Sequence, residues 1–202
     1  MPRLTEERRL ARRDQLIAAA IRCVAREGFH KTTMSAVIAE SGMSAGAVYG
    51  YFESKNDIIR AIADSVLGRM TANLARLTES ATPVTPIDAL ESILEQIRDL
   101  ARDGDGDIPR VAVQAWAEAG RDEAVARIVR ERLAQVRAAW RELLIRARTA
   151  GTLAPDADIE AVAQILLGAM IGFIQQYLLL GDVQPHTYAA AYRALADAPG
   201  SS

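Results

Sequence analysis

The sequence predicts an all-α protein of about nine helices, with a small N-terminal three-helix domain and a larger helical C-terminal domain. Apolar residues recur every three or four positions along nearly the whole chain, which is the period of an amphipathic helix. Serine, threonine, glycine and proline separate these segments where helix caps and stops are expected. We find no run of alternating apolar and polar residues that would indicate a strand.

The bulk composition indicates a folded chain in a reducing compartment. Half of its 202 residues are hydrophobic, a quarter are charged, and the net charge is −2, which argues against intrinsic disorder. The single cysteine excludes an intramolecular disulfide. Residues 1–13 are charged where a secretory signal needs an apolar core, so we expect a cytoplasmic protein. The most apolar run, 165–174, is shorter than the roughly 20 residues of a membrane span, so we expect no membrane partner.

The first two helices are read from an apolar face and its flanking residues. The first is expected to end near Gly28, because glycine adopts left-handed geometry without steric cost. Thr32 and Thr33 offer an N-cap for a second helix over 34–40. The apolar face of the first helix consists of Leu16, Ile17, Ala20, Ile21 and Val24.

A tight turn over 41–43 is expected to lead into a third, short helix. Ser44 can cap this helix, which ends at Tyr49 or Tyr51, and Ser54 can cap the fourth. We expect a first domain over 1–53 and a second over 54–202. The remaining helices are expected from Ser54 to about Leu77 and over 86–102, 108–119, 122–150, 156–180 and 186–196.

The acidic loop at 103–107 has the composition of a calcium loop. It lacks the downstream glutamate and the spacing that such a site requires, so a solvated loop is the preferred interpretation. We expect no metal and no cofactor.

Charge is distributed unevenly. Residues 1–60 carry ten Lys/Arg and seven Asp/Glu, whereas residues 61–202 carry fourteen and nineteen. A basic N-terminal part followed by an acidic C-terminal part is consistent with an N-terminal contact with nucleic acid.

The segment 28–59 contains two short helices separated by a glycine-containing turn, which is a helix-turn-helix pattern. Such a unit places its second helix in the major groove of DNA. Gly42 supplies the turn, and the apolar side chains expected to close the unit onto the first helix are Val37, Ile38, Met43, Val48 and Phe52.

This segment closely resembles the DNA-binding region of the TetR (tetracycline repressor-like, AcrR) family over about residues 10–60. The resemblance implies a repressor that binds a palindromic double-stranded DNA operator as a homodimer and is released by a small-molecule effector. An activator of the same architecture is the alternative that the sequence leaves open. The matching residues are Gly28, Phe29, Thr33, Ile38, Ala39, Gly42, Met43, Ser44, Gly46, Tyr49, Tyr51, Phe52 and Lys55.

The resemblance also implies roles for individual residues. Thr33, Tyr51 and Lys55 match positions that contact phosphate, and Ser35 can reach a base edge or the backbone. Tyr49 and Tyr51 could instead be packing aromatics, and Lys55 an ordinary surface lysine. The groove-facing side of the recognition helix is formed by Ser44, Ala45, Gly46 and Tyr49. Further phosphate or minor-groove contacts could come from Arg3, Arg8, Arg9, Arg12 and Arg13.

The recognition helix departs from many relatives in carrying no Arg, Lys, Asn or Gln. The usual bidentate base contacts are therefore unavailable on it. We expect specificity to rest on Tyr49, Ser35 and Ser44, on a thymine methyl against Ala45, and on DNA shape.

The segment 156–180 is apolar nearly all round, so more than one of its sides must be covered. A second copy of the chain is the simplest cover, and Gly168 and Gly172 would allow close helix approach. The alternative is a central helix of a monomer.

An effector cavity is expected among the middle and late helices. Cavities of this kind are mostly apolar with a few polar groups, so the effector is expected to be partly apolar. Packing in the core is the competing interpretation for each candidate. The candidates are Gln114, Trp116, Trp140, Met170, Phe173, Gln176 and Tyr177.

Two other classes of protein compete with this interpretation. An enzyme is disfavoured because the chain has only two histidines and no nucleophile elbow, metal-spaced cluster or phosphate loop. Cys23 lies on an apolar helix face and is expected in the core. A helical small-molecule-binding protein, or a nucleoid-associated protein without a specific operator, remains the alternative, although the latter is expected to be more basic.

Overall fold

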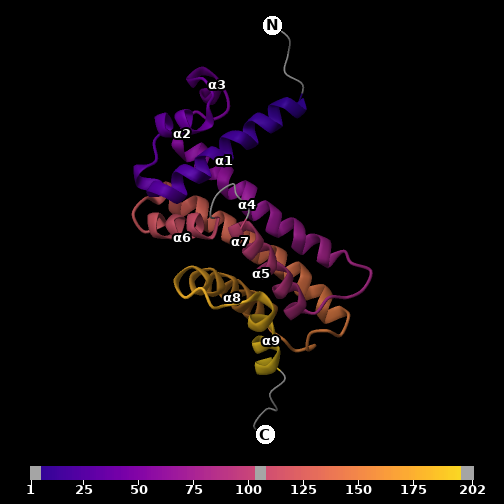
Figure 1. Cartoon of the computed structure of the whole chain (residues 1–202). Coiled ribbons are helices and arrows are strands. Elements are labelled where there is room, and N and C mark those ends of the chain that lie inside the picture. The colour runs from indigo at the N-terminus through magenta and orange to yellow at the C-terminus, as the bar shows by residue number, and fades with distance from the viewer. Residues whose placement is uncertain (1–5, 103–107, 197–202) are drawn as a thin grey trace. The chain divides into compact units, whose positions relative to one another are not determined.

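The computed structural model describes residues 6–102 and 108–196 and forms nine α-helices from them, without a strand in those two ranges (Figure 1). This confirms the predicted all-α class and helix number. Arg3 and the acidic loop at 103–107 lie outside the described residues. The helices are α1 Glu6–Lys31, α2 Met34–Ser41, α3 Ala45–Tyr49, α4 Lys55–Thr78, α5 Pro86–Arg102, α6 Ile108–Ala119, α7 Glu123–Thr149, α8 Ile159–Leu179 and α9 Pro185–Ala196.

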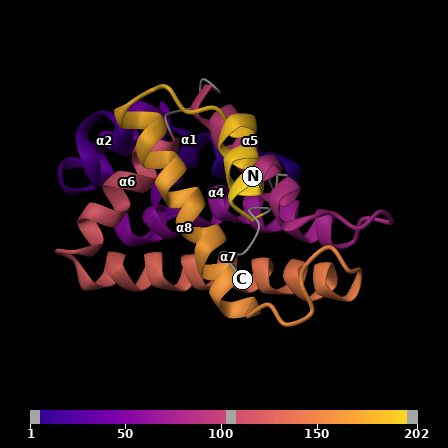
Figure 2. The ribbon, with the colours of Figure 1, turned by 90° about the horizontal axis from the view of Figure 1, so that it is seen from below.

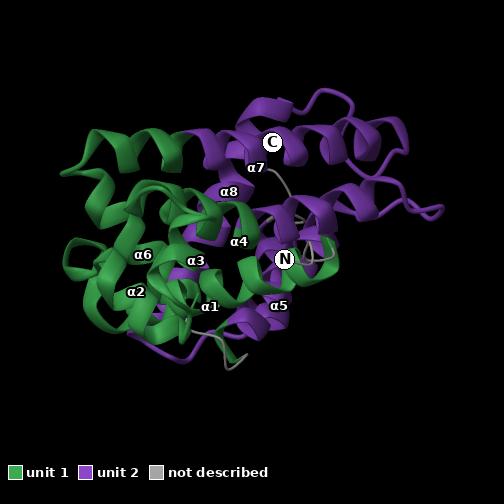
Figure 3. Ribbon diagram, turned by 90° about the horizontal axis from the view of Figure 1, so that it is seen from above, with its two compact units in different colours: residues 1–66, 101–130 green, residues 67–100, 131–202 purple. Residues whose placement is uncertain are grey.

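The chain forms two compact units (Figure 3). Unit 1 comprises residues 1–66 and 101–130, and unit 2 comprises 67–100 and 131–202. Helices α4 and α7 each contribute to both units, as does α5, whose last two residues belong to unit 1. The division expected at residue 53 remains a prediction, because compact packing does not show which part folds independently.

Unit 1 is organised around α1, which packs against α2 and α6. Its central face is fully buried, as the apolar spacing predicted, and Cys23 is part of this core. The burial of each large apolar side chain stabilises the folded state by about 1.5–3 kcal/mol, so this face holds the N-terminal helices together. The buried residues of α1 with at most 2% exposure are Leu16, Ala19, Ala20, Cys23 and Val24.

The first helix breaks at Gly28, where the sequence predicted its end. The geometry there, φ 82° and ψ 162°, differs from the expected left-handed helical one, and a further helical turn continues to Lys31. This conformation belongs to the mirror image of the extended region, which essentially only glycine adopts. The Gly28 carbonyl accepts hydrogen bonds from both the backbone N–H (3.1 Å) and the hydroxyl (2.8 Å) of the buried Thr32. The break therefore turns the chain toward α2.

Unit 2 buries large side chains of α5, the later part of α7, and α8, among them Ile93, Trp140 and Phe173. Helix α8 crosses α7 (Figure 2). It begins at Ile159 because the Asp158 carboxylate caps it, accepting the backbone N–H groups of Glu160 at 2.9 Å and Ala161 at 3.2 Å, so the start expected at 156 was wrong.

Helix α9 is attached to α5 by an ion pair and a histidine–carboxylate hydrogen bond at the edge of unit 2. Arg193 donates to Asp88 at 2.6 Å, and His186 Nδ1 lies 2.8 Å from the Glu91 carboxylate. Both pairs join residues about a hundred positions apart, which no local pattern in the sequence indicates.

Replacing Gly28 by alanine should destabilise the fold by about 1–3 kcal/mol, because alanine is strained in this conformation. Space is not the obstacle, since the nearest neighbour of an added Cβ, Gln114 Oε1, would lie at 3.8 Å. Urea unfolding measures the change. The matched control is Gly68→Ala in the middle of α4, where an added Cβ meets nothing within 4 Å. This substitution should stabilise the fold by about 0.5–1 kcal/mol, because alanine favours a helix over glycine. Equal stability of Gly28→Ala and the unmodified chain would refute the argument.

Candidate nucleic-acid interface

The turn between α2 and α3 is fixed from both sides. Gly42 has φ 68°, and its N–H bonds to the Ala39 carbonyl. The buried Ser41 hydroxyl donates to the Ile38 carbonyl at 2.9 Å and accepts the Met43 N–H at 3.2 Å. The Gln15 amide of α1 donates to the Ser41 carbonyl at 2.9 Å. The two short helices are thereby held at one angle.

Side-chain caps define where α2 and α3 begin, as the sequence predicted. The Thr33 hydroxyl accepts the Ala36 N–H at 3.1 Å, and the Ser44 hydroxyl accepts the Ala47 N–H at 3.3 Å. At the start of α4, Ser54 and Asp57 bond reciprocally. Each cap satisfies donors that a short helix would otherwise leave free.

Helix α3 is anchored by its inner side. Val48 is fully buried and Phe52, just beyond the helix, is 4% exposed. The Arg13 guanidinium lies 5.8 Å from the centre of the Phe52 ring, a cation–π contact between α1 and the end of the helix-turn-helix. Of the five expected core residues, Val37, Val48 and Phe52 are buried, whereas Ile38 and Met43 are half-buried.

The eight residues predicted to contact DNA all lie in unit 1, between Thr33 and Lys55. Tyr49 is half exposed although it is a large aromatic residue. Tyr51 and Lys55 are half-buried, so part of each side chain packs on the protein. The remaining predicted contacts, which are exposed, are Thr33, Ser35, Ser44, Ala45 and Gly46.

The structure does not require glycine at position 46. Gly46 is exposed within α3, and a Cβ added there would meet nothing within 4 Å. A glycine within a helix destabilises the fold by about 0.5–1 kcal/mol relative to alanine. Gly50 differs, since a Cβ there would lie 3.3 Å from the Ala47 carbonyl oxygen. The absence of a side chain at Gly46 thus has no internal explanation.

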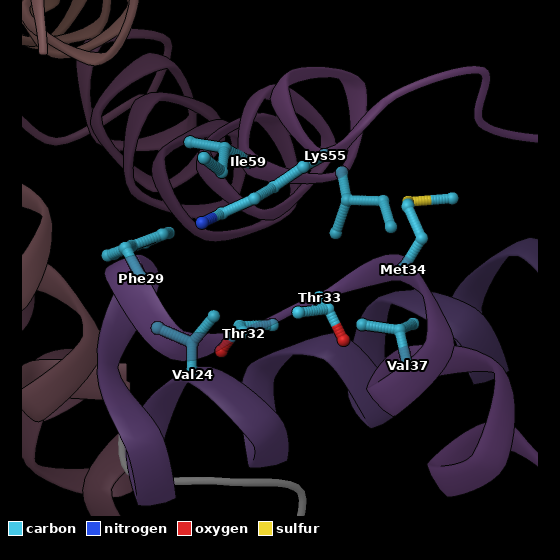
Figure 4. Close-up of a pocket in the computed structure, with 9 residues that line it drawn as sticks. Val24, Phe29, Thr32, Thr33, Met34, Val37, Lys55 and Ile59 are labelled. Atoms are coloured by element: carbon cyan, nitrogen blue, oxygen red, sulfur yellow. The ribbon is translucent and has the colours of Figure 1, made fainter.

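Lys55 extends over a small apolar crevice between the ends of α1, α2 and α4 (Figure 4). Its ammonium group donates to the His30 carbonyl at the end of α1, at 3.4 Å. The methylene chain of Lys55 packs on the apolar crevice while the ammonium group reaches the surface, an arrangement common for lysine. The crevice is lined by Val24, Phe29, Thr32, Thr33, Met34, Val37, Lys55, Ile58 and Ile59.

An ion-pair cluster joins α1 to α2 behind the turn. Glu40 accepts from Arg22 at 2.8 Å and from Arg26 at 3.2 Å. These hydrogen bonds, Arg22 first, lower the pKa of Glu40. Burial is the main cause that raises the pKa of the neighbouring Cys23 thiol, and the Glu40 charge adds to it. Cys23 is therefore held in its unreactive thiol form.

The seven candidate effector residues are divided between the two units. Gln114 and Trp116 lie on α6 in unit 1, where the Gln114 carbonyl oxygen is buried beside Gly28 without a hydrogen-bond partner among the described residues. In unit 2, Trp140, Met170 and Phe173 are buried. Gln176 and Tyr177, also in unit 2, are half-buried. Within 6–102 and 108–196, no group of three or more His, Cys, Asp or Glu is placed to hold a metal ion.

Two tyrosines that the sequence analysis missed extend the candidate set in unit 2. Tyr188 packs edge-on against Phe173, with ring centres 5.4 Å apart, and accepts a hydrogen bond from Gln176 at 3.3 Å. Tyr192 lies 5.5 Å from Tyr188. Burial raises the pKa of Tyr188. The two tyrosines are four residues apart, which places them on one face of a helix. This spacing could have identified them from the sequence.

Sequence comparison matches both parts of the chain to known families. Residues 16–62 match the family described as bacterial regulatory proteins, tetR family. Residues 86–198, more than half of the chain, match the family described as BetI-type transcriptional repressor, C-terminal.

Individual relatives agree with these matches. The HTH-type transcriptional regulator YfiR of Bacillus subtilis is 28% identical over 90% of this chain and 87% of its own. TtgR of Pseudomonas putida is 33% identical over 48% of this chain and 46% of its own. Among solved structures, Salmonella enterica GusR has a TM-score of 0.75 and 26% identity, with 96% of each chain covered. The SmeT–triclosan complex has a TM-score of 0.77 at 21% identity, covering 92% of this chain and 91% of SmeT.

The Glu40 cluster should make the stability of the helix-turn-helix depend on pH. The pKa of Glu40 is lower in the folded state, so its contribution is full above the ordinary carboxyl pKa and is lost as the pH falls through the lowered value. The unfolding midpoints of the unmodified chain and Glu40→Gln should therefore differ near neutral pH, and the difference should shrink as the pH falls below the ordinary glutamate pKa of about 4.3. Glu95→Gln, which removes an exposed carboxylate on α5, is the control. A difference that is constant with pH would contradict this role.

Proposed function

This chain belongs to the TetR family of transcriptional regulators, and we propose that it is a repressor that binds a palindromic operator as a homodimer and is released by a small-molecule effector. Family members are DNA-binding regulators rather than enzymes. The proposed site of action is the cytoplasm, where the operator DNA is found.

The observation that carries the proposal is the two-sided character of α3. Its inner side is fixed by the buried Val48, and its outer side exposes only small residues and Tyr49. An exposed glycine that the fold does not need is explained if the DNA backbone or a base edge occupies the space of the missing side chain. Close approach of the helix backbone would also bring Ser44 and Ala45 within reach of base edges.

Phosphate contacts supply most of the affinity in such complexes. Lys55 retains donors beyond its bond to His30, and the exposed Arg8, Arg9 and Arg12 lie on the first turns of α1. We propose that these cations, with Thr33 and Tyr51, position the recognition helix while α3 and Ser35 read the sequence.

Selection of bound duplexes from a random DNA pool tests the function directly. A repressor of this type should enrich an inverted repeat, and its affinity should fall steeply with salt. Weak and uniform binding, with no sequence enriched, would instead favour the alternative of a small-molecule-binding or nucleoid-associated protein without an operator.

Gly46→Ala should weaken binding to the selected operator by about tenfold, a loss of about 1.4 kcal/mol, because the added methyl occupies space that the DNA needs. The same change should raise the stability of the fold by up to about 1 kcal/mol. Gly68→Ala is the matched control, since it adds the same methyl to an exposed helix away from the interface. Unchanged operator affinity in Gly46→Ala would remove the support for close approach at α3.

The effector is proposed to be partly apolar. The candidate residues in unit 2 are aromatic or sulfur-containing, with the amide of Gln176 and the hydroxyl of Tyr177 as polar groups, which is the usual character of small-molecule sites. Two proteins of the same fold are described with ligands that have large apolar parts: SmeT with triclosan, and FadR of Bacillus subtilis with stearoyl-CoA.

A second copy of the chain is the proposed cover for the outer face of α8. Ile165 is 58% exposed and Leu179 is 81% exposed, and Gly168 lies between them with open space around it. The helix is long and apolar enough to cross a membrane, yet only a third of its apolar window is buried within the chain. Association of two such faces would bury this surface and bring two recognition helices to one palindrome.

Ile165→Arg should convert the dimer to a monomer, because it places a charge in an apolar interface. Light scattering coupled to gel filtration measures the mass, and operator affinity should fall with it. The control is Ile145→Arg on α7, which changes a residue of similar exposure (49%) outside the α8 face. A dimeric Ile165→Arg variant would exclude this interface, and binding of the unmodified chain to lipid vesicles would show that the face meets a membrane.

A further inference from the structure

Trp140 presents an unusual hydrogen bond in the core of unit 2. The side chain is fully buried on α7, and its indole N–H donates to the thioether sulfur of Met170 on α8 at 3.2 Å. An indole N–H can only donate, and a thioether is among the weakest acceptors in proteins. Buried donors are normally paired with oxygen or water. In the described part of the chain, the sulfur is the only partner of this donor.

The surroundings of this pair are apolar. Met170 is 4% exposed, Phe173 on the next turn of α8 is fully buried, and Leu144 on the next turn of α7 is fully buried as well. The arginines of this part of α7 are not buried; Arg137 and Arg141 pair with Glu160 at the surface. Arg132, two turns before Trp140, buries its Nε but not the whole side chain. Within 6–102 and 108–196 no cationic residue is buried as a whole, so an uncompensated carboxylate beside Trp140 would be strongly disfavoured.

Met170 is suited to be a temporary partner. Its side chain has three rotatable bonds and adapts to different packing arrangements. An oxygen acceptor in place of the sulfur would give the indole N–H a stronger bond, and the apolar body of the same molecule could fill the volume that the methionine leaves.

We propose that the Trp140 N–H is the hydrogen-bond donor of the effector site, and that Met170 occupies the acceptor position until the effector displaces it. The effector class that fits is a neutral, largely apolar molecule with a carbonyl, ether or phenol oxygen. This inference rests on the proposed function, because it specifies the ligand of the regulator, but it concerns unit 2 alone.

Matched pairs of probes that differ only in the acceptor test this class. Acetophenone with ethylbenzene, and benzophenone with diphenylmethane, compare a ketone with a hydrocarbon of similar shape. The chain has two tryptophans, so Trp116→Phe leaves Trp140 as the only indole, and its fluorescence reports binding beside it. Thermal shift of the unmodified chain measures the same pairs with Trp116 in place. The ketone of at least one pair should bind roughly three- to tenfold more tightly than its hydrocarbon, the factor that one hydrogen bond supplies.

Two variants separate the proposed role from ordinary packing. Met170→Leu conserves volume and removes the sulfur, so it should lower the melting temperature, increase ketone affinity, and leave hydrocarbon affinity unchanged. Trp140→Phe removes the donor and should bring the ketone-to-hydrocarbon ratio close to one. A purely structural tryptophan would change both affinities alike.

Three results would overturn the inference: ketones and hydrocarbons that bind equally, a ratio that survives in Trp140→Phe, or no response of Trp140 to either ketone. Operator binding by the unmodified chain without any probe is measured separately. If the chain binds its operator but does not distinguish ketones from hydrocarbons, only the proposed effector class is refuted. If the chain selects no operator, the proposed function is refuted.

Discussion

The break at Gly28 is the constraint on which the N-terminal unit depends. Helix α1 supplies the buried face against which α2 and α6 pack, but the helix-turn-helix can form only if the chain leaves the axis of α1 after residue 27. The conformation that turns it is accessible to glycine and strained for other residues. Thr32 secures the break through two bonds to one carbonyl. The start of α2, and through it the placement of α3, follow from this geometry.

The local features of the interface could be predicted because each depends on residues close in sequence. The caps at Thr33 and Ser44 and the turn at Gly42 satisfy backbone groups within three positions. The helix period likewise predicted the buried face of α1. The same reasoning failed at the start of α8, where Asp156 and Asp158 are equally good caps by residue type. Only the backbone conformation of the loop decides between them.

Features that join distant segments could not be predicted in this way. The Gln15 bond to the α2–α3 turn spans 26 residues, and the Arg193–Asp88 pair spans 105. The side chains of Gln15, Asp88 and Arg193 are ordinary polar groups on exposed or half-buried helix positions, and no periodicity distinguishes them from their neighbours. The candidate effector residues show the same limit. Trp116 and Trp140 are both tryptophans on amphipathic helices, yet they lie in different units.

The two proposals for unit 2 converge on α8. Its inner side carries Met170 and Phe173, and its outer side carries Ile165 and Leu179, so the helix would contact the effector with one face and the partner chain with the other. An effector that displaces Met170 must change how α8 packs on α7, because protein interiors are close-packed and have little free volume. A change in α8 would then alter the proposed interface between copies. The free energy that the effector contributes to release from DNA is limited to its differential affinity for the two arrangements. The weak bond from Trp140 to Met170 favours such a response, because little stabilisation is lost when it breaks and more is gained when an oxygen replaces the sulfur.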